Sequence, residues 1–363
     1  MKKSNLAELH KELGGIFLEG NQSQTPNYYD DPDNEIIHVR NSSGIVDISG
    51  RGMLKISGKD HLKLLQGMLT NDMVKLEVGK GNHAVALTVK GRMLADMRAF
   101  KFPDFMLFDT EPGLQTVLAE HLNKFKLSYK ADIKDSTNDY LHFHICGPKS
   151  TDFVDSEFQL SVSEFSEYDN KKIHINNAEI FLIKINRTGE TGFDLITESG
   201  EAGKLFRDLL SKGEVAGLKP FGINALNTMR IEAGIPLFGI DMDDSTIPIE
   251  AGLWDALDFE KGCYLGQEVI ARIKWRGRVN WHLTGLETTD NTVFAVGSKI
   301  FNGDKEIGRI TSTTFSKTLC KNIALGYIRR EFREEGQAVL IKSGENSYLN
   351  AIVRDLPFIN NFN

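Results

Sequence analysis

The chain changes character near residue 280, and this change limits the folds open to it. Before that point, strand-like alternation and helical spacing are mixed along the chain. After it, short strand-like runs recur at regular spacing, separated by turns such as Asn302-Gly303, a dipeptide that favours hairpins. The sequence therefore predicts an α+β region over residues 1–280, followed over residues 281–363 by a small β-barrel or sandwich.

Two hairpins are predicted within the first region. Apolar residues alternate with small or polar ones over residues 85–89, and the alternation resumes over residues 93–99 after a Lys-Gly-Arg turn. Residues 180–185 and 193–196 predict a second hairpin, whose turn is rich in glycine and hydroxyl groups.

Helical spacing predicts three further elements. Two helices are expected over residues 201–212 and 222–233, and each is followed by a glycine that can end it. Another is expected around residues 62–69, with Ser57 ahead of it as a cap. The polar stretch over residues 21–34 offers little to bury and is expected to be a surface loop.

Charge and hydropathy argue against several classes of protein. A formal charge of −7 does not favour direct binding to nucleic acid or to an anionic membrane surface. No apolar run of signal-peptide length follows the first two lysines, and no later stretch approaches the roughly 20 apolar residues of a membrane span. The cysteines Cys146, Cys263 and Cys320 are odd in number and far apart, which fits a reducing compartment. We therefore expect a cytoplasmic protein.

Common nucleotide and metal motifs are incomplete. Gly50-Arg51-Gly52 lacks the third glycine of the dinucleotide fingerprint, and no phosphate loop is present. The acidic run that begins at Asp241 has Thr246 and Gly252 where a calcium loop needs glycine and glutamate. His142 and His144 share a predicted strand face but lack the motifs of a zinc site. No metal site is expected within this chain.

Arg230 and Glu190 each allow two interpretations. On its predicted helix Arg230 lies beside the apolar stripe, so its charge needs a partner. An internal salt bridge with Glu232 or Glu190 meets that need, and so does a polar ligand. Glu190 lies in a glycine-rich turn, where it is either solvated or placed where a ligand ring can approach the backbone while the carboxylate accepts hydrogen bonds from N–H donors.

Cys263 lies in the segment Lys261-Gly262-Cys263-Tyr264, just ahead of a helix expected to begin near Leu265. The helix N-terminus and Lys261 both favour a thiolate, which indicates a reactive thiol. A lone cysteine is otherwise a small buried residue, and this second interpretation is the one adopted for Cys146 and Cys320.

Several segments resemble the glycine-cleavage T-protein superfamily. They are Arg187-Thr188-Gly189-Glu190-Thr191-Gly192-Phe193 and Met229-Arg230-Ile231-Glu232-Ala233-Gly234-Ile235-Pro236-Leu237, with Leu69-Thr70-Asn71-Asp72 and Pro248-Ile249-Glu250-Ala251-Gly252-Leu253. The likeness covers roughly residues 40–280, and the β-rich tail is compatible with it. Lys261-Gly262-Cys263-Tyr264 with Gly266-Gln267-Glu268 resembles the hallmark of the YgfZ-type branch, which supports iron–sulfur protein maturation.

The resemblance implies a three-lobed arrangement with a C-terminal β-barrel and with tetrahydrofolate, or a one-carbon derivative of it, in a central opening. It places Glu190 and Arg230 at the folate site and gives the thiol chemistry to Cys263. T-proteins carry paired aspartates where this chain has Ala95 and Asp96. If the missing acid is the catalytic one, ordinary aminomethyl transfer is lost, although Asp96 can still contact the folate.

These residues lead to one main hypothesis and two alternatives. The main hypothesis is a folate-binding accessory protein for the assembly or repair of iron–sulfur proteins, with those proteins as partners, indirect effects on tRNA modification, and weak or absent turnover. The first alternative is a folate-dependent aminomethyltransferase of the glycine-cleavage type. The second is a non-catalytic scaffold with a vestigial folate site.

Overall fold

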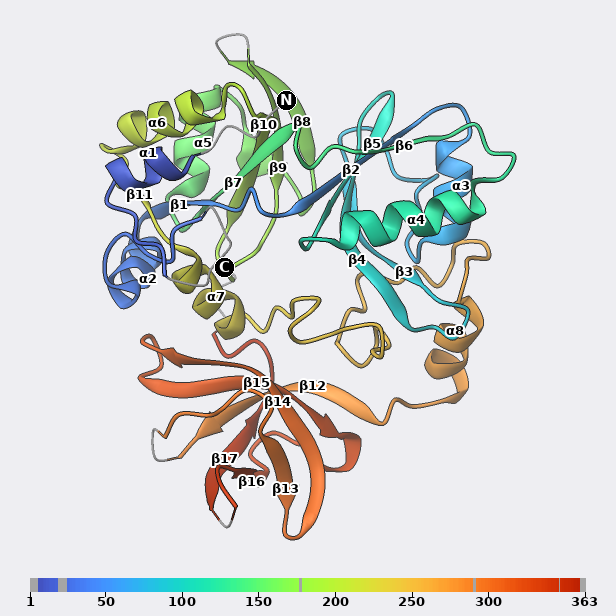
Figure 1. Ribbon diagram of the computed structural model, residues 1–363, viewed down its shortest axis with the longest axis vertical. Helices are drawn as coiled ribbons and strands as arrows, with labels where there is room; N and C mark the ends of the chain where they lie inside the picture. Colours follow the sequence, from blue (N-terminus) through green and yellow to red (C-terminus); the bar gives the residue numbers. More distant parts are fainter. Residues whose placement is uncertain (1–5, 19–24, 176–177, 290–291, 346, 360–363) are drawn as a thin grey trace.

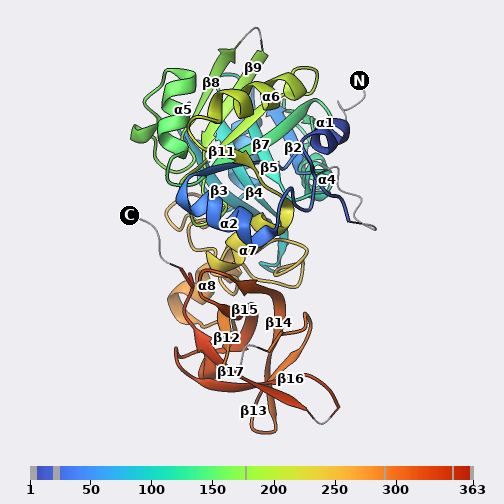
Figure 2. The same cartoon turned by 90° about the vertical axis from the view of Figure 1, so that its left-hand side faces the viewer.

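Three lobes make up the molecule. The structure is a computed structural model that describes residues 6–18, 25–175, 178–289, 292–345 and 347–359. Two α+β lobes, here called lobe one and lobe two, lie side by side above a β-barrel (Figure 1). The barrel stays below both lobes when the molecule is turned by 90° (Figure 2).

Lobe one is built on a six-stranded sheet with the order β11-β1-β7-β10-β9-β8. Helices α1, α5 and α6 cover one face of this sheet, where Phe143, Leu195 and Phe206 are part of one apolar core. Helices α2 and α7 pack near β1 on the other face. The bounds are β1 Ser43–Asp47, β7 Tyr140–Cys146, β8 Asn170–Ile175, β9 Ala178–Lys184, β10 Gly192–Glu198, β11 Leu218–Pro220, α1 Ala7–Glu12, α2 Pro32–Asn41, α5 Ser150–Phe158, the 3₁₀ helix η1 Val162–Glu164, α6 Ala202–Gly213 and α7 Ile223–Glu232.

Lobe two lies between β1 and β7 in the sequence. Its five-stranded sheet has the order β3-β4-β5-β2-β6, and α3 and α4 cover one face of it. The bounds are β2 Gly52–Ser57, α3 His61–Met68, β3 Gly81–Leu87, β4 Met93–Lys101, β5 Phe105–Thr110, α4 Leu114–Lys126 and β6 Asp132–Asp135.

The helix-free face of the lobe two sheet meets, at the centre of the molecule, the face of the lobe one sheet that lies opposite α1, α5 and α6. Strand alternation places Phe100 of β4 and Phe181 and Ile183 of β9 in one buried cluster that joins the lobes. The same alternation sends Asp96 and Arg98 of β4 to this inner face, whereas Ala95 and its neighbours Met97 and Ala99 pack in the core beneath the helices. The inner faces therefore carry the charged side chains of the protein's centre.

The C-terminal part is a closed barrel with the order β12-β15-β14-β13-β16-β17. Ile231 of α7 packs against Ile323 and Leu325 of β15, so the helix that follows lobe one's last strand joins that lobe to the barrel. The bounds are α8 Gln267–Arg276, β12 Trp281–Thr288, β13 Lys299–Asn302, β14 Lys305–Ser316, β15 Lys321–Arg329, the 3₁₀ helix η2 Arg330–Phe332, β16 Ala338–Lys342 and β17 Tyr348–Arg354.

The predicted α+β fold with a C-terminal barrel is confirmed, and so are both predicted hairpins, which are β3–β4 and β9–β10. The predicted cap of α3 is wrong. Ser57 ends β2, Gly58 turns the chain with a φ of +98°, and Asp60 is the residue at the N-cap. The division of the chain at residues 280 and 281 stays a prediction.

The prediction of a surface loop over residues 21–34 is wrong for its last residues, because a helix begins there. The first residues of that stretch lie outside the described residues. Helix α2 begins at Pro32, and Asp31 caps it by accepting a hydrogen bond from the backbone N–H of Asp33 at 2.9 Å. Aspartate followed by proline is a helix-start signal that the polar composition of the stretch concealed.

None of the helices in the described ranges is both long and apolar enough to cross a membrane. The cytoplasmic location stays a prediction.

Candidate functional site

A cavity of about 680 Å³ opens at the junction of the lobes. Its lining comes from the chain before α2, the loops around β2 and β5, strand β4, the β9–β10 turn, α7 and the segment after α7. The apolar part of the lining includes Ile223, Leu226, Leu237, Phe238 and Ile240. The volume is within the range of roughly 300–1,000 Å³ that is usual for small-molecule sites.

The polar part of the lining is rich in cations and also includes Glu111. Four guanidinium groups line the cavity, those of Arg51, Arg98, Arg187 and Arg230, and the amides of Asn186, Asn224 and Asn227 lie among them. A lining that combines apolar side chains with guanidinium and amide groups suits a flat ligand with hydrogen-bonding edges.

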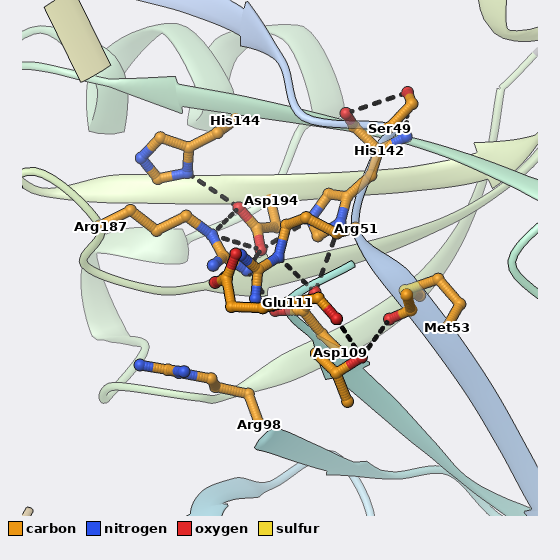
Figure 3. Close-up of polar contacts among 12 residues, drawn as sticks. Ser49, Arg51, Met53, Arg98, Asp109, Glu111, His142, His144, Arg187 and Asp194 are labelled. Carbon is orange, nitrogen blue, oxygen red and sulfur yellow. Dashed lines mark hydrogen bonds and ion pairs between the residues drawn. The ribbon is translucent and has the colours of Figure 1, made fainter. Parts of the chain in front are cut away.

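Buried carboxylates compensate two of these arginines. Asp109, at the end of β5, accepts from Arg51 Nε at 2.5 Å and from Arg187 Nη2 at 2.6 Å (Figure 3). Asp194 of β10 also accepts from Arg187 Nη2 at 2.6 Å. Burial opposes ionisation, but the arginines outweigh it and lower the pKa of Asp109 to about 2. The cluster therefore stays ionised and joins lobe two to lobe one.

His142 and His144 support this cluster from β7. His142 Nε2 lies 2.7 Å from one oxygen of Asp194, and His144 Nδ1 lies 2.8 Å from the other. Burial lowers the pKa of His144, although its hydrogen bond to Asp194 opposes this shift. The sequence placed both histidines on one strand face, and the structure shows that this face points to an aspartate. Within the described residues, no group of three or more His, Cys, Asp or Glu side chains could hold a metal ion.

Arg230 lines the cavity and is itself held by the protein. Its Nη1 donates to Asp241 at 2.5 Å, its Nη2 to Ser312 at 2.7 Å and its Nε to Asn227 at 2.9 Å. Burial lowers the pKa of this guanidinium, and Asp241 opposes the shift. The salt-bridge partners suggested by the sequence, Glu232 and Glu190, are wrong, because the segment after α7 folds back and brings Asp241 to the arginine. Contact between Arg230 and a ligand stays a prediction.

Glu190 is buried in the β9–β10 turn. It follows Asn186 and Arg187, two residues of the cavity lining, by a few positions in the sequence. Its carboxylate accepts from Arg40 Nη1 of α2 at 2.6 Å, and Arg40 also donates to Glu232. The turn depends on Gly189, whose φ is +81°. The folate-binding role of Glu190 is untested by this geometry and stays a prediction.

Asp96 is nine-tenths or more buried on the inner face of β4. It accepts from His83 Nε2 at 2.5 Å and from Arg98 Nη1 at 2.6 Å. Burial raises its pKa, but Arg98 and His83 outweigh burial and hold the pKa well below its usual range. The carboxylate is ionised and touches a residue of the cavity wall.

Ala95 is fully buried on the other face of β4, against the helices of lobe two. An acid at this position would point away from the cavity. The loss of one acid from the pair therefore leaves the inward-facing carboxylate in place, and the sequence argument against aminomethyl transfer loses its physical basis.

Cys263 is exposed, four residues ahead of the first residue of α8. Lys261, expected to favour its thiolate, instead donates to the carbonyl oxygens of Leu69 and Asn71, both at 2.7 Å, and burial lowers the pKa of this lysine to about 8. The reactivity of Cys263 stays a prediction.

The other two cysteines differ from each other. Cys146 is buried, as expected, and burial raises the pKa of its thiol to about 12. Cys320 is exposed between β14 and β15 with a φ of +54°, so the prediction of a buried thiol is wrong for it.

Comparison with known proteins identifies the family. The model of the GCVT N-terminal domain matches residues 6–261, and that of the glycine cleavage T-protein C-terminal barrel domain matches residues 282–360. The chain belongs to the glycine cleavage T-protein family. Similar curated proteins are aminomethyltransferases from Oceanobacillus iheyensis, 31% identical with 88% of each chain covered, and Caldanaerobacter subterraneus, 28% identical over 99% of this chain and 96% of that one.

A solved T-protein has the same fold. The crystal structure of glycine cleavage system aminomethyltransferase T from Bartonella henselae superposes with a TM-score of 0.89 at 23% identity, covering 98% of this chain and 97% of that one. At this identity the likeness concerns the fold alone.

The comparisons overturn the main hypothesis from the sequence. The similar curated proteins are named aminomethyltransferase, and none of those reported belongs by name to the YgfZ-type branch. The assignment to iron–sulfur protein assembly, with its client proteins and its link to tRNA modification, is therefore wrong. It rested on the short segment around Cys263, whereas the family relationship extends over nearly the whole chain.

Sequence reasoning missed Arg51, Arg98, His83 and Asp109. The register of the β3–β4 hairpin, which pairs His83 with Arg98, offered a signal for two of them. Arg51 and Asp109 come together because β2 and β5 pair in one sheet, with Met53 opposite Asp109, and no local pattern in the sequence reveals that these two distant segments pair.

Proposed function

We propose that the protein is a folate-dependent aminomethyltransferase, which moves a one-carbon unit from an aminomethyl donor to tetrahydrofolate and releases ammonia. One observation carries the proposal. The retained Asp96 faces inward and holds Arg98 of the cavity wall, while Ala95 occupies the position that faces the helices. A carboxylate beside a ligand cavity is suited to proton transfer at a reacting amine.

The cavity supports tetrahydrofolate as the acceptor. The apolar lining residues, which include Leu226 and Phe238, can pack against a flat ring, and the guanidinium and amide groups of the lining can bind its polar edges. In this proposal Arg230 contacts the folate directly, and Glu190 binds Arg40 from the same β9–β10 turn that supplies Asn186 and Arg187 to the cavity.

The first experiment measures binding. Leu226→Trp should fill the cavity and abolish tetrahydrofolate binding in anaerobic calorimetry. Val215→Trp, at a position that is 99% exposed, is the matched control and should bind as the wild type does. Equal binding by both variants would exclude this cavity as the folate site.

The second experiment measures transfer from an aminomethyl-lipoyl carrier as tetrahydrofolate-dependent ammonia release. Asp96→Asn should lower the rate roughly 100-fold or more, the usual effect of removing an acid–base group. Asp104→Asn, on the exposed β4–β5 turn, should leave it unchanged.

A scaffold with a vestigial folate site remains the second candidate because Nε, Nη1 and Nη2 of Arg230 all bind protein atoms. Tetrahydrofolate binding without ammonia release by the wild type would favour the scaffold. Ammonia release that depends on Asp96 would exclude it.

A further inference from the structure

His83 is a buried titratable group to which the proposed function gives no task. It lies on β3, is 4% exposed and has a carboxylate at each ring nitrogen. Its Nε2 is 2.5 Å from Asp96, and its Nδ1 is 3.2 Å from Asp255 in the segment between α7 and α8. An imidazole between two carboxylates can take a proton at one nitrogen and release a proton from the other.

The two ends of this chain of contacts lie in different surroundings. The side chain of Asp255 is 63% exposed, whereas that of Asp96 is 2% exposed. Asp96 in turn binds Arg98, which lines the cavity. The three residues therefore connect the inner face of lobe two to bulk water.

The side chains of Thr70 and Asn71 hydrogen-bond to backbone groups beside His83 and Asp255 and hold these two residues in place. Asn71 Nδ2 donates to the carbonyl oxygens of both His83 and Asp255, at 2.9 and 3.0 Å. Thr70 donates to the carbonyl of Ala256 at 2.6 Å and accepts from the N–H of Val85 at 2.9 Å. The segment that supplies Asp255 is thereby fixed to the strand that supplies His83.

The charges around His83 set its protonation. Burial lowers its pKa, but Asp96 and the hydrogen bond to Asp255 outweigh burial and Arg98, so the pKa is raised. Tyr168 lies near Asp96, Arg98 and Asp255, and burial raises its pKa to about 12, which keeps it neutral. His83 therefore carries a proton at a higher pH than a free histidine does.

We propose that Asp96, His83 and Asp255 form a proton relay between the cavity and water. This inference rests on the proposed function. Asp255 takes a proton from water and passes it to Nδ1 of His83, whose Nε2 proton then moves to Asp96. Asp96 gives this proton to the leaving amine as the C–N bond of that amine breaks. The acceptor amine forms the new C–N bond to the same carbon and releases one proton to water, so one proton enters and one leaves. In a second step the carrier's C–S bond breaks as the second acceptor nitrogen bonds to the carbon, and the thiolate takes the proton of that nitrogen. His83 and Asp255 act through Asp96 and are positioning residues.

The test uses His83→Gln, which keeps hydrogen-bonding capacity without a titrating group, and Asp255→Asn, which alters the exposed end alone. His83→Gln should lower kcat roughly 10-fold to 100-fold, within or just below the range for acid–base groups, with little change in KM. It should also remove one limb of the pH profile of kcat. Glu260→Gln, at a nearby exposed acid, is the matched control and should behave as the wild type does.

A second measurement does not depend on turnover. Nitrogen-15 NMR of the His83 ring should give a pKa above that of free histidine in the wild type, and a lower pKa in Asp255→Asn, because one stabilising carboxylate is lost. In Asp255→Asn the limb of the kcat profile should move to lower pH.

Two results would overturn the relay. Transfer by Asp255→Asn with an unchanged pH profile, or a His83 ring that titrates as free histidine does, would refute it while leaving the proposed function intact. Absence of transfer by the wild type would instead refute the proposed function, and a relay serving that reaction would fall with it. If His83→Gln does not fold, Asp255→Asn alone decides the question.

Discussion

Arg40 should contribute far more to stability than its position on a short helix indicates. Its guanidinium donates to Glu190 and Glu232, and both partners are buried. Glu232 also accepts from Ser316 Oγ of β14 at 2.5 Å. Arg40→Met keeps an unbranched side chain but leaves two buried carboxylates without their cation.

The structure sets the size of the expected loss. Removing one partner of a buried ion pair costs about 3–5 kcal/mol, since the remaining charge is desolvated and unpaired. Arg40 is 10% exposed and Glu232 is 0% exposed, so solvent screens this pair little. Ser316 still donates to Glu232 in the variant, which favours the lower half of that range.

Urea unfolding at pH 7 measures the loss of stability. The protein has three lobes and can unfold in more than one transition, so the free energy is taken from the first transition. The control is Arg207→Met, whose ion pair with Glu12 is 58% and 57% exposed and should contribute about 0–1 kcal/mol. If Arg40→Met does not fold, Ser316→Ala should still cost about 1.5–3 kcal/mol, the usual value of a hydrogen bond to a charged group. Equal destabilisation by Arg40→Met and Arg207→Met would refute the reasoning.

Three further predictions concern the centre of the protein and its thiols. The free energy of unfolding should fall as pH drops from about 4 towards 2, because Asp109 has a lower pKa in the folded protein than in the unfolded chain. The ionised carboxylate stabilises the fold above the unfolded pKa, and this stabilisation is lost as pH falls through the folded pKa. Asp109→Asn should weaken this pH dependence in urea unfolding at several pH values. Ala95→Asp should destabilise the protein by several kcal/mol without raising ammonia release, because the new carboxylate enters the core beneath the helices; a gain in activity would contradict this. With a thiol reagent, Cys263 and Cys320 should react quickly and Cys146 only after unfolding, whereas a single fast thiol would disagree with the described exposures.

The elements of the fold were largely readable from the sequence because their signals are local. Alternation predicted β3–β4 and β9–β10, and two glycines marked where helices end, Gly213 as the last residue of α6 and Gly234 shortly after α7. The barrel strands followed from short runs and turn residues. Each of these signals depends on neighbours within a few positions along the chain.

The candidate site was only partly readable because its contacts join distant segments. Arg230 was correctly expected to need a partner, but Asp241 could not be chosen over Glu232 without the course of the chain after α7. The prediction that Ala95 removes the catalytic acid failed for a related reason. The sequence shows which acid of the pair is missing, but only the orientation of β4 shows that this position faces the helices.

The order of the strands also bears on how the chain acquires its structure during synthesis. All strands of lobe two come from the continuous stretch between Gly52 and Asp135, so this lobe can form as soon as that stretch has left the ribosome. The sheet of lobe one pairs β1 with β11, which ends at Pro220, so its first strand must wait for residues made much later. Until then the Ile45 and Val46 side chains, fully buried in the finished protein, lack their native cover. Lobe one is therefore the part of the nascent chain in which helper proteins would find exposed apolar strands.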